Sequence, residues 1–246
     1  MQSDLMFKQR RDQAMVGEPI EAVVFDFGGV FTNSPSVAVR RAAHEAGVDP
    51  DALLDMMLGS YGEESDHPWQ RVERGELALA EARSWARAES KHRFGVELDP
   101  MQVMAPLMAE PPRLAMLSLA SDLRDAGIST ALLTNNAKEL GDHWRSLADW
   151  DGLLDVVVDS SEIGVRKPSR EAFDYALDAL GVQSPASALM LDDFAVNVEG
   201  ARRAGMQAVQ VGDDPTLAIR EVRVRALGQQ SWSSGVMAHL ALLALL

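Results

Sequence analysis

The chain has no cysteine, and this absence removes several kinds of chemistry at once. Disulfide frameworks, thiolate metal sites and cysteine nucleophiles are excluded, and a reducing compartment, the cytoplasm, is the simplest expectation. Positive charge is also scarce. Because 37 acidic residues face 23 basic ones, the formal net charge of -14 repels nucleic-acid phosphates, and we expect no nucleic-acid partner.

Long apolar runs are missing as well. The charged segment 1–17 has no continuous apolar stretch of the kind found in a signal peptide, so export is not expected. The most apolar segment, 236–246, is too short to cross a bilayer. We therefore expect no membrane span. We interpret this segment as a helix packed on the protein or on a second copy, which makes a homodimer possible; weak membrane contact is the less favoured alternative.

Five short apolar segments end in polar residues or glycine, a pattern typical of buried parallel strands. They are 21–26, 128–134, 153–158, 188–191 and 207–211. A helical pattern precedes each of the last four strands, at 114–126, 138–149, 170–180 and 197–204. Strands that alternate with helices predict an α/β protein in which helices cover both faces of a parallel sheet.

The stretch from about residue 34 to 110 interrupts this alternation directly after the first strand. It contains five candidate helices, at 36–46, 50–58, 68–74, 76–94 and 100–108. An insert in this place can cover a site at the strand ends and exclude water. We therefore predict a Rossmann-like three-layer core (19–33 and 111–222) with an inserted helical cap domain (34–110), an N-terminal arm (1–18) and a C-terminal tail with the apolar helix (223–246).

Polar side chains stand where the predicted strands end. Three of them are carboxylates, and a threonine and an asparagine complete the set: Asp26, Asp192, Asp193, Thr134 and Asn135. Because the carboxyl ends of parallel strands meet at one edge of a sheet, these groups are expected to share a site. Three carboxylates at one edge repel one another unless a divalent cation lies among them, and hard oxygen ligands suit Mg²⁺.

Four segments carry a family resemblance. The segments 24–30 (VFDFGGV), 132–136 (LLTNN), 164–168 (GVRKP) and 190–194 (MLDDF), in this order, resemble the four motifs of the haloacid dehalogenase-like (HAD) hydrolase superfamily. With residues 31–35 and 195–200, the chain looks like the helical-cap branch that contains sugar-1-phosphate phosphatases and the N-terminal phosphatase domain of soluble epoxide hydrolases. The resemblance implies a Mg²⁺-dependent phosphatase that acts on a small phosphorylated metabolite.

Phosphoryl transfer needs a nucleophile, positive charge and donors that hold the phosphate in line. The expected catalytic residues are the nucleophile Asp26, which would form an aspartyl-phosphate, the donor Thr134 and the cation Lys167. The expected substrate-binding residues are Asn135, Asn136, Arg166 and His67. The expected metal ligands are Asp26, the backbone carbonyl of Gly28 and Asp193, with Asp192 as a further ligand or a supporting group. Asn197 could orient the aspartates.

Lys167 is one of only four lysines in the chain. It stands in a loop just before a proline, so its replacement by alanine is expected to lower the rate far more than the stability.

Gly28 departs from the family pattern. Most phosphatases of the superfamily have at this position a second aspartate that protonates the leaving oxygen. We therefore expect a good leaving group, as in a sugar-1-phosphate, acyl phosphate or aryl phosphate, or a substitute acid from the insert. His67 is the candidate whose ordinary pKa lies nearest neutrality; the others are Glu63, Glu64 and Asp66. Some members of the branch also have glycine here.

Other functions remain possible. A 2-haloacid dehalogenase would use the same Asp26 nucleophile without metal, although such enzymes typically lack the pair Asp192 and Asp193. A phosphonate-cleaving enzyme would need a lysine in the cap, where Lys91 lies in a charged helix. A phosphorylated receiver has its paired acids on the first strand and the phosphorylated aspartate in the middle, whereas here the pair comes after the other site residues. A catalytically silent binding protein is the remaining alternative, and turnover of an activated aryl phosphate would separate it from an enzyme.

Overall fold

The structure is a computed structural model that describes residues 18–60 and 65–228. Its centre is a parallel sheet of five strands in the order β3-β2-β1-β4-β5. The strands are β1 (Ala22–Phe25), β2 (Ser129–Thr134), β3 (Val156–Asp159), β4 (Ala188–Asp192) and β5 (Gln207–Gln210). Phe25 of β1 pairs with Leu132 of β2 and Leu191 of β4, so the polar ends of these three strands meet at one edge.

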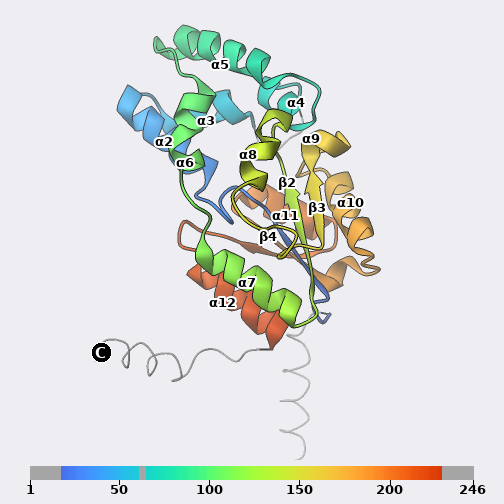
Figure 1. Cartoon of the computed structure of the whole chain (residues 1–246). Helices are drawn as coiled ribbons and strands as arrows, with labels where there is room; N and C mark the ends of the chain where they lie inside the picture. The colour runs from blue at the N-terminus through green and yellow to red at the C-terminus, as the bar shows by residue number, and fades with distance from the viewer. Residues whose placement is uncertain (1–17, 61–64, 229–246) are drawn as a thin grey trace, which may run out of the picture.

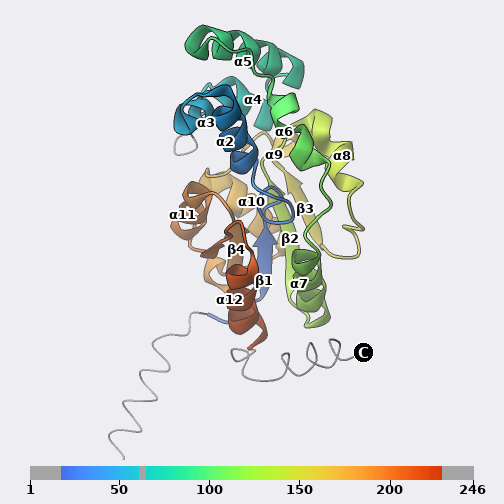
Figure 2. The same ribbon diagram turned by 90° about the vertical axis from the view of Figure 1, so that its left-hand side faces the viewer.

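Helices cover both faces of the sheet, as Figures 1 and 2 show. α7 (Leu114–Asp125) and α12 (Thr216–Leu227) pack together on one face, and α10 (Arg170–Leu180) and α11 (Ala195–Arg203) cover the other. Successive strand residues point to opposite faces of the sheet. Val23 and Phe25 therefore pack in the core beneath α7 and α12, whereas Ala22 and Val24 pack in the core beneath α10 and α11. The predicted three-layer α/β core is confirmed.

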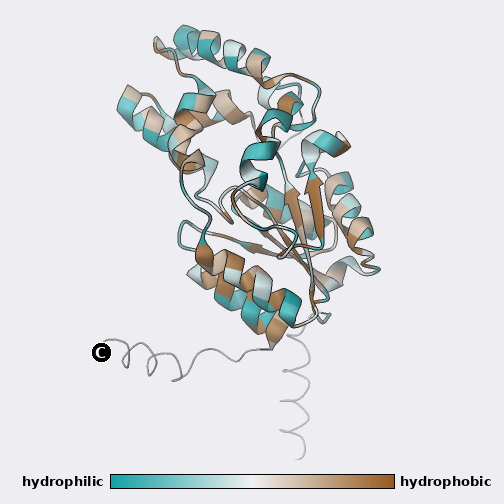
Figure 3. Cartoon of the chain, in the orientation of Figure 1, coloured by the Kyte–Doolittle hydropathy of each residue, from teal (hydrophilic) through white to brown (hydrophobic). Residues whose placement is uncertain are grey.

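The apolar side chains of the sheet are buried from both sides, and Figure 3 shows brown strands between helices of mixed colour. α10 presents its apolar residues at helical spacing, with Ala172, Phe173, Ala176 and Leu177 buried against the strands. Burial of a side chain such as Phe173 contributes roughly 1.5–3 kcal/mol. The two cores therefore hold the strand ends in fixed positions beneath the cap.

The cap consists of α2 (Pro35–Ala46), α3 (Pro50–Leu58), α4 (Pro68–Glu73), α5 (Leu79–Phe94) and α6 (Pro100–Met108). Proline stands in the first turn of α2, α3, α4 and α6, where its missing N–H costs nothing. The cap has its own apolar core, which includes Leu53, Met56 and Met57. In both views it stands above the carboxyl ends of the strands (Figures 1 and 2).

Several boundaries differ from those expected. The helix predicted at 138–149 is a short turn, η1 (Lys138–Leu140), followed by α8 (Gly141–Arg145). α8 ends early because Trp144 and Trp150 are both buried in the core, where the indole N–H of Trp150 donates to the carbonyl of Trp144. β3 begins at Val156, later than expected, and two unexpected short elements are α9 (Ser160–Ile163) and η2 (Pro185–Ser187).

The two ends of the chain bear on other expectations. α12 runs to Leu227 and packs Val222 in the core, so it continues past the boundary expected at 222. The apolar segment 236–246 and the arm 1–17 lie outside the described residues. Within 18–60 and 65–228, no helix combines the length and the apolar character needed to span a bilayer.

Candidate active site

Three carboxylates meet where β1 and β4 end. Asp26 follows β1, Asp192 is the last residue of β4, and Asp193 comes next. One carboxylate oxygen of each lies within 4.8 Å of the other two. The backbone N–H of Asp26 donates to the carbonyl of Leu191 (2.8 Å), so the hydrogen-bond ladder between the two strands extends into the site. The structure brings together the three acids that were expected at one edge.

Lys167 lies between two of these carboxylates. Its Nζ is 2.7 Å from Oδ1 of Asp26 and 2.6 Å from Oδ2 of Asp192, and its side chain is completely buried. Asn135 holds the lysine's backbone from both sides, because its Oδ1 accepts from the N–H of Lys167 and its Nδ2 donates to the carbonyl (both 2.9 Å). Lys167 is therefore an internal cation, not a residue of an exposed loop.

Asn135 has a structural role besides the substrate contact expected of it. Its side-chain amide binds the backbone of Lys167, and the residue also lines the cavity between the cap and the strand ends. Position 200 supports the same loop: a Cβ there would lie 2.9 Å from Cβ of Pro168, so only glycine lets α11 approach this closely. The loop that carries the lysine is fixed by both contacts.

Asp192 is held by several donors. Its Oδ1 accepts from the N–H of Phe194 (2.9 Å) and from Nδ2 of Asn197 (3.0 Å), and its Oδ2 accepts from Lys167. The expected orienting role of Asn197 fits this geometry. Since both oxygens of Asp192 already accept hydrogen bonds, its position is that of a supporting group between the lysine and α11.

Asp193 differs from its neighbour in one respect. Its Oδ2 accepts a hydrogen bond from Oγ of Ser34 (2.5 Å), but its Oδ1 is buried and has no hydrogen-bond partner within the part of the chain that the structure describes. A buried carboxylate oxygen without a donor is costly. Gly29 allows this placement: it has a φ of 76°, and a Cβ there would lie 2.2 Å from Cγ of Asp193.

The electrostatics of the cluster follow from burial and crowding. Burial raises the pKa of Asp26 to about 7, against the attraction of Lys167. Burial, with the charges of Asp192 and Asp26, raises the pKa of Asp193 to about 8. Burial also disfavours the charged ammonium of Lys167, but the two carboxylates that it contacts outweigh this effect and raise its pKa. One lysine therefore does not balance the negative charge of the cluster.

The donor set fits a hard divalent cation. Asp26 and Asp193 supply oxygens within 4.8 Å of each other, and among the residues that the structure describes Oδ1 of Asp193 is buried without a donor. Mg²⁺ prefers carboxylate and carbonyl oxygens, and its charge would stabilise both carboxylates in their ionised form. The three clustered aspartates could therefore hold a cation, and the contribution of the Gly28 carbonyl stays a prediction.

Two residues that the sequence did not single out support the loop after β1. Nη1 of Arg113 donates to the carbonyl of Gly29 (2.9 Å), and its Nη2 donates to Oδ1 of Asn33 (2.9 Å). Ser34 caps α2, accepting from the N–H of Ser36, and also contacts Asp193. A serine before a proline indicates a helix cap, and nothing in the sequence indicated that Ser34 also contacts Asp193. No local signal identifies Arg113.

A cavity of about 140 Å³ lies between the cap and the strand ends. Its floor includes Gly28, Thr134 and Asn136, each of which the sequence placed at the site. Most of the other lining side chains are apolar: Phe27, Leu140 and Leu147 from the core, and Pro35, Leu58, Trp69, Met101, Met104, Leu107 and Met108 from the cap region. The cavity therefore adjoins the carboxylate cluster and is closed mainly by apolar groups.

Asn136 lines this cavity, but its polar atoms bind the protein. Its N–H donates to Oγ of Ser160 (3.1 Å), its Nδ2 lies 3.4 Å from Oδ2 of Asp159, and its Oδ1 accepts from the N–H of Ala137. Asn136 thus shapes the turn after β2. The side-chain oxygen of each of the two asparagines thus accepts from a backbone N–H of the protein.

Arg166 links the core to the cap. Its Nε donates to Oε2 of Glu73 in α4 (2.6 Å), and both side chains are buried. Glu73 also accepts from the indole of Trp69 (2.9 Å). The expected substrate-binding role of Arg166 is not supported by this geometry, because its guanidinium is turned to the cap. No motif marked Glu73 as its partner, since the two are far apart in sequence.

His67 is a structural residue, which corrects its expected role as a substrate-facing acid. Its Nδ1 accepts from the N–H of Trp69 as the cap of α4 (3.2 Å), and its Nε2 is 3.0 Å from the carbonyl of Met56. Burial lowers its pKa, which disfavours the protonated acid form. Asp66 is exposed, and Glu63 and Glu64 lie outside the described residues. No substitute acid is found among His67 and Asp66.

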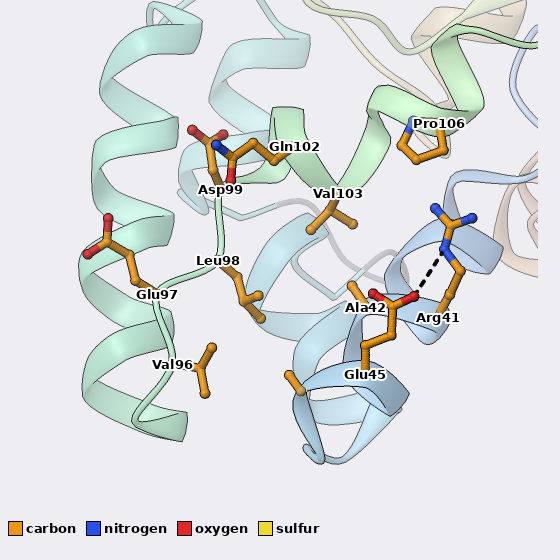
Figure 4. A pocket seen from close by; sticks show the side chains of 11 residues that line it. Arg41, Ala42, Glu45, Val96, Glu97, Leu98, Asp99, Gln102, Val103 and Pro106 are labelled. Atoms are coloured by element: carbon orange, nitrogen blue, oxygen red, sulfur yellow. Dashed lines mark ion pairs between the residues drawn. The ribbon is translucent and has the colours of Figure 1, made fainter.

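A larger hollow of about 510 Å³ lies elsewhere, on the cap (Figure 4). It is lined by α2, α6 and the segment before α6, and none of the three clustered carboxylates contributes to it. Arg41 and Glu45, one turn apart on α2, form an ion pair at its edge (3.9 Å). Asp99 forms an ion pair with Arg83 (2.8 Å). This hollow is separate from the candidate active site.

Comparison with known proteins places this geometry in a family. The model of the haloacid dehalogenase-like hydrolases matches residues 20–205. Bifunctional epoxide hydrolase 2 of Mus musculus is 27% identical over 222 residues, which cover 82% of this chain and 38% of that protein. A phosphatase of Mycobacterium tuberculosis is 43% identical over 93 residues, which cover 37% of this chain and 42% of that protein. The matched segments thus span less than half the length of each of these two relatives.

Solved structures share the fold. A HAD family enzyme of Bacteroides thetaiotaomicron, in complex with magnesium and inorganic phosphate, matches with a TM-score of 0.52 at 18% identity, over 79% of this chain and 96% of that one. An L-2-haloacid dehalogenase of Xanthobacter autotrophicus matches with a TM-score of 0.54 at 23% identity, over 82% of each chain. Since the family model covers most of the 246 residues, this chain belongs to the haloacid dehalogenase-like hydrolases.

Proposed function

We propose that this hydrolase is a Mg²⁺-dependent phosphatase that cleaves a small phosphate monoester through an aspartyl-phosphate on Asp26. The observation that carries the proposal is the arrangement of charge around this residue. A buried lysine lies on one side, and on the other lies Asp193, one oxygen of which has no donor within residues 18–60 and 65–228. The similarity to a phosphatase of Mycobacterium tuberculosis supports the same reaction class.

The chain's own residues account for the first step. Lys167 binds Oδ1 of Asp26 and orients the carboxylate for attack on phosphorus. A bond forms between a carboxylate oxygen and phosphorus while the ester P–O bond breaks, and the leaving oxygen departs with the electron pair. The Thr134 hydroxyl and the backbone of the turn after β2 would donate to the phosphoryl oxygens. Water then cleaves the new P–O bond, which releases inorganic phosphate and restores Asp26.

Mg²⁺ would be held by Asp26, Asp193 and the backbone carbonyl of Gly28, and when bound it neutralises charge on the phosphoryl group. Asp192 supports this set, because its oxygens bind Lys167 and Asn197. Ser34 positions Asp193 through Oδ2. The buried lysine helps to keep Asp26 ionised, and thus nucleophilic, at neutral pH.

A phosphatase screen tests the proposal. The wild-type protein should release inorganic phosphate from a panel of phosphate monoesters in Mg²⁺ and lose this activity in EDTA. Asp26→Asn should reduce turnover by at least about 10⁴-fold, since the amide cannot attack phosphorus, while the circular dichroism spectrum stays unchanged. Appreciable turnover by this variant would exclude a covalent mechanism on Asp26.

The 2-haloacid dehalogenase is the second candidate, and the pair of Asp26 and Lys167 is compatible with it. It predicts release of chloride from 2-chloropropionate in EDTA. Its weakness is that it gives no role to the buried oxygen of Asp193. If neither phosphate nor chloride is released from any compound of the two panels, the catalytically silent binding protein becomes the better hypothesis.

A further inference from the structure

The cavity above the strand ends limits which esters could react. Gly28 and Thr134 line it, and the proposed function places both beside the phosphoryl group on Asp26. An ester oxygen that leaves on the side opposite Asp26 is directed toward the cap. The organic part of the substrate would therefore occupy this cavity, and the lining determines what it can be.

Two of the polar lining residues already bind other protein groups. Glu73 accepts from Arg166 and from Trp69, and Nε2 of His143 is 3.2 Å from the carbonyl of Met108. Among the described residues, no lysine or arginine lines the cavity. A carboxylate or a second phosphate placed here would lose its water without meeting a cationic side chain, and a sugar would place most of its hydroxyls against apolar groups.

The volume indicates the size of the group that the cavity can surround. At about 140 Å³, the cavity is comparable to an engineered apolar cavity of roughly 150 Å³ in another protein that binds benzene. A single ring therefore fits, whereas a fused pair of rings or a long chain would extend beyond this space. Met104 and Trp69 are among the cap residues that line the cavity, and both pack in the cap core.

The surroundings of Gly28 point to the nature of the leaving group. Glycine offers no acid there, and a Cβ at this position would lie 3.3 Å from the ring of Pro35. A phenol can leave as its anion and take up a proton afterwards from water. An alkoxide is a far poorer leaving group, and it depends on a general acid.

From these features we propose that the substrate is a phosphate monoester of a compact apolar phenol, with a single ring seated in the cavity beneath Met104. The inference rests on the proposed phosphatase function. It replaces the sugar-1-phosphate that the sequence left open, because most of this lining is apolar and would leave sugar hydroxyls without water.

The test compares kcat/KM for four esters in Mg²⁺: phenyl phosphate, 3-carboxyphenyl phosphate, 1-naphthyl phosphate and glucose 1-phosphate. Phenyl phosphate should exceed the carboxyphenyl ester and glucose 1-phosphate by about 100-fold or more. It should exceed the naphthyl ester by about tenfold or more, because the second ring does not fit.

Two variants locate the effect in the cavity. Met104→Ala enlarges it and should raise the ratio of naphthyl to phenyl kcat/KM by about tenfold. Met57→Ala is the matched control, since it truncates a buried methionine of the same cap core that does not line the cavity. It should leave the ratio unchanged. If Met104→Ala does not fold, the wild-type ratios still decide the question.

The outcomes separate the two proposals. If glucose 1-phosphate, the carboxyphenyl ester or the naphthyl ester matches or exceeds phenyl phosphate, the assignment to a compact apolar phenol is wrong while the phosphatase stands. A ratio that changes equally in both variants would also overturn the assignment to this cavity. If Mg²⁺ supports no release of phosphate from any of the four esters, the proposed function fails, and the inference with it.

Discussion

Asp193 provides a quantitative test of the metal site. It faces two other carboxylates whose oxygens lie within 4.8 Å. At an effective dielectric constant of about 20, two unit charges at this distance repel by about 3.5 kcal/mol. Lys167 offsets part of this repulsion. We therefore expect Asp193→Asn, which keeps the shape and removes the charge, to raise the free energy of unfolding of the metal-free protein by about 1–3 kcal/mol at pH 8.5.

Mg²⁺ should affect the two proteins differently. For the wild type, a Mg²⁺ concentration of about 100 times Kd stabilises the folded state by about 2.7 kcal/mol, equivalent to roughly 5–10 °C in Tm for a chain of this size. The variant has lost one of the two proposed carboxylate ligands and should show little shift. Differential scanning fluorimetry in EDTA and in a Mg²⁺ series measures both effects.

The Mg²⁺ effect should also depend on pH. The folded-state pKa values of Asp26 and Asp193 are raised to about 7 and about 8 from a usual value of 3.8. The metal-free protein therefore binds protons more tightly when folded. The stability contributed by these two groups is complete below about pH 4 and is lost as the pH rises through 7 and 8. Mg²⁺ must displace these protons, so its stabilising effect should be larger at pH 8.5 than at pH 6.

A matched control is available in the cap. Asp99 is also a buried aspartate, but it pairs with Arg83, away from the cluster. Asp99→Asn should destabilise the protein and keep the full Mg²⁺ shift. The reasoning would be refuted if Asp193→Asn destabilised the metal-free protein, or if it kept a Mg²⁺ shift equal to that of the wild type.

Two further substitutions test the geometry. Lys167→Ala should lower the free energy of unfolding of the metal-free protein by about 3–5 kcal/mol, measured by urea denaturation, because two carboxylates lose their buried partner. The catalytic rate should fall as well. A loss of rate without a loss of stability would indicate that the lysine is exposed. Gly29→Ala should abolish the Mg²⁺ shift in Tm, since its Cβ would displace Asp193, whereas Gly127→Ala, which has a φ of 78° and free space around it, should retain the shift. Equal Mg²⁺ shifts in both glycine variants would contradict the close approach.

Local pattern was sufficient for the framework of the molecule. The apolar runs, the helical spacing and the polar strand ends predicted the parallel sheet, the inserted cap and the gathering of Asp26, Asp192 and Asp193, all of which the structure contains. These predictions succeed because strand and helix periodicity are properties of short segments, and because parallel strands place their carboxyl ends at one edge.

The roles of individual polar side chains depended on contacts between distant segments. Arg166 meets Glu73 of the cap, Asn135 binds the backbone of Lys167, and the ring nitrogens of His67 are used within α4 and α3. Each of these residues carries a donor or acceptor that could have faced a substrate. Which partner it takes is decided by the packing of the cap on the core, which sequence spacing does not specify.

The chain's own sequence therefore determined the fold class and the identity of the clustered acids, because both follow from local periodicity and strand order. Only the tertiary structure decided that Lys167 is internal, that an oxygen of Asp193 is buried without a donor in the described part of the chain, and that the cavity above them is small and mostly apolar. These properties arise from burial, and the burial of a side chain depends on every segment that packs around it.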